Sequence, residues 1–215
     1  MPIRVVDLEW MSQPDFPEAH FALGVLCSQG YGVPKDYAAA FRHFQTAAQA
    51  GLTWAQYALA GLYEVGYGTP KDLAQAVHWY RQAAIKDHPG AIHSLGVMYQ
   101  QGIGAPSDPV EAAALFRRGA DLGYPLSTLE LAKCYEEGIG VARDHRKARE
   151  LYFAAAKSKH PSAASAHGAI ALLYKEGRLG LPFDETEAAK WYASFSELMR
   201  EESKARHGDD GSSCS

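Results

Sequence analysis

Cysteine is scarce in this chain of 215 residues, and it has neither a long apolar run nor an excess of positive charge. Its three cysteines, Cys27, Cys134 and Cys214, lie far apart and do not suggest the disulfide framework of small secreted domains. We therefore expect a cytoplasmic protein, although a secreted chain that has lost its signal would look the same. The net charge of −4 argues against nucleic acid as a partner. No apolar stretch approaches the roughly 20 residues of a membrane span, so we expect no membrane insertion.

Recognised catalytic and metal-binding motifs are also missing. The chain has no G-x-x-x-x-G-K-[ST], H-E-x-x-H, C-x-x-C or G-x-S-x-G motif, which are the patterns of phosphate loops, metalloproteases, thiol sites and serine hydrolases. The nine histidines do not show zinc-ligand spacing with further ligands nearby. We therefore expect no catalytic residue, no metal and no cofactor.

What the chain does contain is one unit repeated along its length. Residues 55–84 read AQYALAGLYEVGYGTPKDLAQAVHWYRQAA, and similar segments lie 36 residues before, 36 after and 72 after. The first loop glycine of each copy recurs at the same interval at Gly30, Gly66, Gly102 and Gly138, with Gly177 after a step of 39. A fixed period in this range is typical of repeat architectures, in which each copy is one supersecondary unit.

Each unit predicts a helix, a glycine loop and a second helix. Apolar residues recur at helical spacing before the loop, and glycine just past a helix end favours a left-handed backbone. An aspartate then stands where it would cap the second helix, at Asp36, Asp72, Asp108, Asp144 and Asp184. Gln75, Glu111 and Glu187, three residues further on, would complete a capping box by accepting the backbone N–H of the aspartate.

The pattern A-x3-L-[GA]-x2-Y-x2-G-x-G-x3-D-x3-A-x2-W-Y-x2-A-A resembles the Sel-one-like repeat family, which is related to tetratricopeptide repeats. The resemblance implies an all-α fold, a right-handed α/α superhelix (solenoid) of five repeats of about 36 residues. It further implies that the first helices line a concave face and that the protein is a scaffold or adaptor. Some cysteine-rich secreted relatives are linked to β-lactam binding or hydrolysis, but this chain lacks their cysteines and any Ser-x-x-Lys motif.

The repeats divide the chain into a cap, a solenoid and a tail. We expect a segment at 1–18 that covers the first repeat, a solenoid over 19–205, and a disordered tail at 206–215. The expected repeats are 19–54, 55–90, 91–126, 127–165 and 166–201. The last helix is expected to be polar on the side where a sixth repeat would dock.

Candidate binding residues are those that the repeat itself does not need. On a helical wheel the first helices direct one set of side chains away from the core, and large groups there are typical of binding surfaces. The candidates are Phe21, Val25, Tyr57, Glu64, His93, Gln100, Leu129 and Lys133. The alternative for Phe21 and Tyr57 is packing against the neighbouring repeat.

These observations favour a non-catalytic protein-interaction scaffold that binds a peptide or a partner domain on its concave face. One alternative is a hydrolase or binding protein for small molecules or cell-wall fragments, like the cysteine-rich relatives. Another is a structural subunit of a larger complex in which the open ends of the solenoid stack. The sequence does not determine the oligomeric state, and we favour a monomer.

Overall fold

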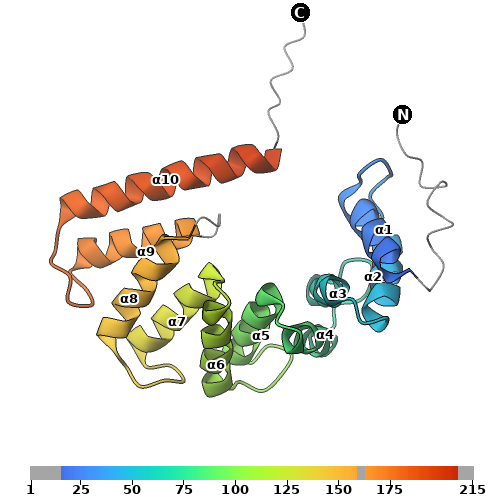
Figure 1. The fold of residues 1–215 in the computed structure, drawn as a ribbon, viewed down its shortest axis with the longest axis horizontal. Coiled ribbons are helices and arrows are strands. Elements are labelled where there is room, and N and C mark those ends of the chain that lie inside the picture. The colour runs from blue at the N-terminus through green and yellow to red at the C-terminus, as the bar shows by residue number, and fades with distance from the viewer. Residues whose placement is uncertain (1–15, 159–162, 208–215) are drawn as a thin grey trace, which may run out of the picture. The chain divides into compact units, whose positions relative to one another are not determined.

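The computed structural model describes residues 16–158 and 163–207, and these ranges contain ten helices and no strand (Figure 1). The helices are α1 (Pro17–Gln29), α2 (Tyr37–Gln49), α3 (Thr53–Val65), α4 (Leu73–Ile85), α5 (Pro89–Gln101), α6 (Pro109–Asp121), α7 (Pro125–Glu137), α8 (His145–Ala156), α9 (Ala163–Glu176) and α10 (Glu185–His207). The N-terminal cap expected at 1–18 lies outside the described residues except for its last three. The expected tail also lies outside them, apart from 206–207 at the end of α10.

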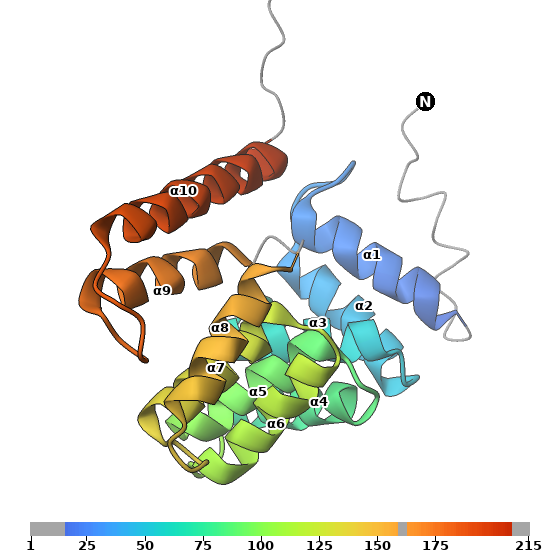
Figure 2. The same cartoon turned by 60° about the vertical axis from the view of Figure 1, so that its left-hand side comes forward.

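The chain forms two compact units that divide after Ala112, within α6. The first unit contains the helix pairs α1–α2 and α3–α4 together with α5, and the second contains α7–α8 and α9–α10. In both views the two helices of each pair lie side by side, joined by a glycine loop (Figures 1 and 2). Each unit is therefore a stack of helix–loop–helix repeats.

Aspartate begins the second helix of every repeat, as the sequence predicts. Each Asp side chain accepts the backbone N–H of the residue three positions later, at 2.9–3.0 Å. The five capping residues are Asp36, Asp72, Asp108, Asp144 and Asp184. This contact satisfies one of the N–H groups that has no partner inside the helix.

The expected capping box is wrong, and the loop itself provides the reason. The backbone N–H of Asp72 donates to the carbonyl of Tyr63 on the first helix at 3.0 Å, and the other four caps make the equivalent bond. This N–H is therefore not available to the side chain of Gln75. The bond instead closes the loop between the two helices of one repeat.

Glycine ends the first helix of each repeat in the left-handed conformation, as expected. Gly66 has φ of 87°, and Gly30, Gly102, Gly138 and Gly177 lie between 62° and 78°. The second loop glycine has a different role, because an added Cβ at Gly68 would lie 2.0 Å from the carbonyl oxygen of Tyr37 in the preceding repeat. Gly68 therefore lets one repeat lie directly against the backbone of another.

The core of the first unit joins two successive repeats. Phe44 and Ala47 of α2 pack with Ala55 and Leu59 of α3 in one buried cluster. Within the first repeat, Gly24 gives the ring of Phe44 room, since an added Cβ would lie 2.6 Å from it. Small residues at these helix crossings allow the close approach that buries the aromatic ring.

The core of the second unit extends from α7 to the last loop. Leu129 and Tyr152 pack with Ile170 of α9 and with Leu179, which is buried in the longer fifth loop. Leu179 has φ of 55°, and its carbonyl accepts a hydrogen bond from Arg149 of α8 at 3.1 Å. The fifth loop has one residue more between its first glycine and its capping aspartate than the other loops have. Through Leu179, this longer loop takes part in the contact between the fourth and fifth repeats.

Candidate functional site

The aromatic candidates Phe21 and Tyr57 pack within and between repeats. The ring of Phe21 lies 5.7 Å from that of Phe44. Tyr57 stacks on His88 at 4.4 Å, and an added Cβ at Gly90 would lie 3.1 Å from the Tyr57 ring. Both rings are partly buried. Of the two roles considered for these residues, the contacts favour repeat packing.

Leu129 is not exposed, which corrects the expectation that it lies on the outer face. It is 5% exposed and belongs to the core of the second unit with Ala132 and Tyr152. The wheel assigned one buried stripe to each first helix, but α7 contacts both its own second helix and the following α9. The first helix therefore buries more than one stripe.

Two glutamates on first helices accept hydrogen bonds from tyrosines of the second helices. Tyr80 donates to Glu64 at 2.6 Å, and Tyr152 donates to Glu136 at 2.7 Å. Glu136 is 8% exposed and forms an ion pair with Arg178 of the fifth loop. These glutamates hold helices together, so the candidate Glu64 has a structural role.

The sequence carried a signal for these pairs that the helical wheel did not use. In the second and fourth repeats, the eighth residue after the capping aspartate is tyrosine and the residue two before the loop glycine is glutamate. Where that position is Phe44 or Phe116, the first helix has Ser28 or Gln100 instead. Comparing the repeats position by position would have predicted the Tyr–Glu bonds.

The other polar candidates remain partly exposed. Lys133 forms an ion pair with Glu130 at 2.7 Å, and its side chain is 44% exposed. The carbonyl of Gln100 accepts a bond from Ser107 at 3.3 Å, and His93 is partly buried on α5. An ion pair as exposed as that of Lys133 contributes little to stability.

One position on the first helices combines partial exposure with small size. Val25, Gly61 and Val97 each stand five residues before the loop glycine, and each is partly exposed. An added Cβ at Gly61 would have its nearest neighbour, the Tyr80 hydroxyl, at 3.8 Å, so this position has room. We call these three residues of the first unit the first-helix strip.

Two histidines in the first repeat share a hydrogen bond. Nδ1 of His20 lies 3.0 Å from Nδ1 of His43, so one of these nitrogens must donate and the other must accept. Burial and the neighbouring His20 and Arg42 lower the pKa of His43. Both effects favour the neutral form, and the pair therefore links α1 to α2.

Burial moves other titratable groups away from reactivity near neutral pH. It raises the pKa of the Cys134 thiol to about 11, whereas a nucleophilic cysteine needs a lowered pKa. Burial and Glu64 likewise raise the pKa of Tyr80. Among the described residues, no three His, Cys, Asp or Glu side chains are grouped as metal ligands would be.

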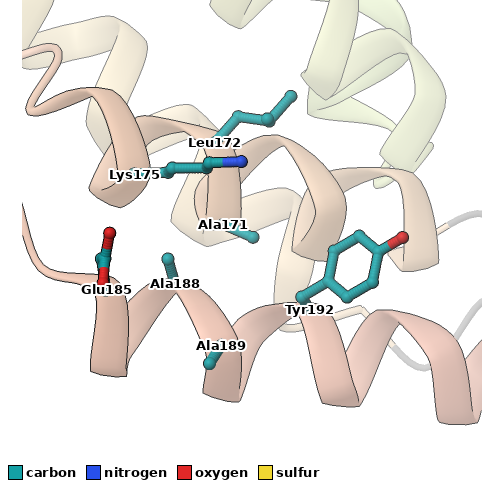
Figure 3. Close-up of a pocket in the computed structure, with 7 residues that line it drawn as sticks. All are labelled: Ala171, Leu172, Lys175, Glu185, Ala188, Ala189 and Tyr192. Atoms are coloured by element: carbon teal, nitrogen blue, oxygen red, sulfur yellow. The ribbon is translucent and has the colours of Figure 1, made fainter.

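An open groove lies between the last two described helices (Figure 3). It has a volume of about 440 Å³ and is lined by Ala171, Leu172, Lys175, Glu185, Ala188, Ala189 and Tyr192. Leu172 and Tyr192 are 52% and 60% exposed. This contradicts the expectation that the last helix is polar where a further repeat would dock.

Helix–loop–helix units with a left-handed glycine and an aspartate cap define an all-α repeat protein of the solenoid class, as predicted. The Sel1 repeat family matches at residues 17–52, 55–88, 89–124, 125–160 and 161–198. The chain therefore belongs to the Sel1 repeat family, whose members are generally non-catalytic helical scaffolds for protein interaction. No described helix has both the length and the apolar character of a membrane span.

Solved structures agree with this assignment. A protective antigen of uropathogenic Escherichia coli that displays an SLR fold is 34% identical with a TM-score of 0.80, over 91% of this chain and 41% of the antigen. A Sel1 repeat protein from Oxalobacter formigenes is 30% identical with a TM-score of 0.78, over 90% and 79%. The immunity protein Pa5087 of Pseudomonas aeruginosa shares the fold at 20% identity, with a TM-score of 0.57, over 85% and 66%. This chain thus spans less than half of the E. coli antigen, and no curated protein sequence matches it.

Proposed function

We propose that this protein is a non-catalytic interaction module that binds a peptide or a partner domain along its first helices. The observation that carries the proposal is the first-helix strip. Val25, Gly61 and Val97 recur at the same helical turn, are partly exposed and have no side-chain hydrogen-bonding groups. Small residues in a row let the backbone of a partner approach closely, and apolar contact there supplies affinity.

Polar residues beside the strip supply specificity in this proposal. Gln100 lies one turn from Val97 on α5, and His93 lies one turn away in the other direction. In the second unit, Lys133 occupies the position that is equivalent to Gly61. Hydrogen bonds and charges around an apolar contact select one partner over another.

The test changes the strip without changing the fold. Gly61→Lys with Val97→Lys places two long charged side chains on the strip, and Lys133 already occupies the equivalent position in the fourth repeat. The matched control is Gly61→Ala with Val97→Ala. We expect affinity capture from the native host to recover a partner with the wild type and the alanine control. The lysine variant should bind that partner at least about tenfold more weakly at an unchanged melting temperature. Equal binding by both variants would contradict the proposal.

A further inference from the structure

The groove between α9 and α10 is equivalent to a surface that is covered in the other repeats. The eighth residue after the capping aspartate is Phe44, Tyr80, Phe116 or Tyr152 in the first four repeats, at 4%, 4%, 0% and 4% exposure. In the fifth repeat that residue is Tyr192, which is 60% exposed. In the first repeat, Phe44 is covered by α3 of the next repeat. The fifth repeat thus presents an open site for a first helix.

The first repeat presents the opposite half of such a contact. Ala55 and Ala91, eleven residues before their loop glycines, are both 0% exposed, whereas the equivalent Ala19 is partly exposed. Leu26 is also partly exposed, whereas Leu62, which is equivalent, is 8% exposed. Within residues 16–158 and 163–207, the face of α1 that would contact a preceding repeat is therefore incompletely covered.

The loop glycines show the same difference in more detail. Added Cβ atoms at Gly68 and Gly104 would lie 2.0 and 2.3 Å from the carbonyl oxygens of Tyr37 and Leu73, which begin the second helices of the preceding repeats. Gly32 has a similar φ of 72°, but no atom of the described residues lies within 4 Å of an added Cβ there. The residue equivalent to Tyr37 in the last repeat is Glu185, on the rim of the groove.

We propose that the protein associates with itself head to tail. The face of α1 and the Gly30–Gly32 loop of one molecule pack into the α9–α10 groove of a second molecule, with Gly32 against the start of α10. The occupant is a second copy because the chain carries the matching helix face itself. Ala19 and Leu26 stand at the positions of Ala55 and Leu62, which belong to the face that α3 packs against α2.

Phe195 limits the extent of this contact. It stands eleven residues after Asp184, where Ala47 and Ala155 stand in the first and fourth repeats. Its ring would lie 3.5 Å from a Cβ added to Gly168 on α9, and so it fills one end of the site. The second molecule contacts the half nearer the loop, and the association is weaker than an internal repeat interface. Because the two surfaces differ, the contact is heterologous and can extend beyond a dimer.

Two substitutions block the two sides separately. Tyr192→Glu places a negative charge in the groove. Its control, Thr186→Glu, makes the same change in charge at an exposed position of α10. The equivalent position in the fourth repeat holds Arg146, which is also exposed. Gly32→Asn adds a side chain that tolerates positive φ. Its control, Gly123→Asn, has φ of 77° and equally open surroundings.

Sedimentation velocity over a wide range of protein concentration tests the proposal with the full chain. We expect the weight-average mass of the wild type and both controls to rise with concentration. Tyr192→Glu and Gly32→Asn should each remain monomeric, with association at least about tenfold weaker. An equimolar mixture of these two variants should form dimers and nothing larger, since only one intact pair of surfaces remains. A wild type that stays monomeric throughout, or association that neither variant weakens, would overturn the proposal.

Discussion

Replacing Gly68 by alanine tests whether the second loop glycine sets the contact between repeats. An added Cβ would lie 2.0 Å from the carbonyl oxygen and 2.4 Å from the carbonyl carbon of Tyr37. These are backbone atoms at the first residue of α2, and they cannot move without displacing that helix. Gly32 provides the matched comparison, because its φ of 72° is close to the 70° of Gly68 and its surroundings are open.

The expected magnitudes separate backbone strain from steric conflict. A left-handed backbone costs an L-residue roughly 1–2 kcal/mol, and Gly32→Ala should cost no more than this. Gly68→Ala adds a conflict of about 1–3 kcal/mol, for a total of roughly 2–5 kcal/mol. Since 1 kcal/mol shifts the Tm of a chain of this size by about 2–4 °C, Gly68→Ala should lower Tm about two to three times as much as Gly32→Ala.

Thermal and urea unfolding followed by circular dichroism measure both variants against the wild type. Both should be compared at the same low concentration, so that self-association does not contribute to the apparent stability. If Gly68→Ala and Gly32→Ala lower Tm equally, the glycine is needed only for its φ. The contact with Tyr37 would then not be what requires glycine at this position.

Three further predictions concern buried polar groups. In urea unfolding, Tyr152→Phe should destabilise the protein by about 1–3 kcal/mol and Tyr80→Phe by about 0.5–1.5 kcal/mol. The costs differ because Glu136, the acceptor of Tyr152, is buried, whereas Glu64, the acceptor of Tyr80, is partly exposed. Equal costs would refute this ranking. Burial lowers the folded-state pKa of His88 from 6.5, so its contribution to stability is present above pH 6.5 and is lost as the pH falls through the lowered value. His88 is the N-cap of α5 and accepts the backbone N–H of Ala91 at 3.1 Å. His88→Asn keeps an N-cap and should flatten the fall of Tm below pH 6.5, and an unchanged slope would count against this origin. Burial raises the pKa of the Cys134 thiol from 9.0 to about 11, so this thiol should resist alkylation in the folded protein and react after unfolding. Mass spectrometry measures the labelling, and rapid labelling of the native thiol would contradict its burial.

Local features of the fold were predictable from the sequence because they depend on few neighbouring residues. The left-handed Gly66 and the cap by Asp72 follow from the backbone preferences of glycine and the reach of an aspartate side chain. The capping box failed because the N–H of Asp72 is already bonded to Tyr63, nine residues earlier. Even within one repeat, a nearby competitor can change the outcome.

The candidate site depended on contacts between repeats, which a helical wheel does not contain. Leu129 is buried because α7 packs on more than one helix. Glu136 is buried against Arg178, 42 residues later in the chain. Tyr192 shows the reverse case. It stands at the position of the buried Tyr80 and Tyr152, but it is exposed because no following repeat covers it among the described residues. The binding role of the first-helix strip remains a proposal.

Hydrogen–deuterium exchange with the captured partner tests the central claim most directly, since it reports which helices the partner protects. The protein should be compared alone and with a saturating amount of the partner, using Gly61→Lys with Val97→Lys as the control. We predict added protection in α1, α3 and α5, the helices that carry the strip, and none in the control. Protection confined to α2 and α4, or protection that persists in the control, would contradict binding along the first helices.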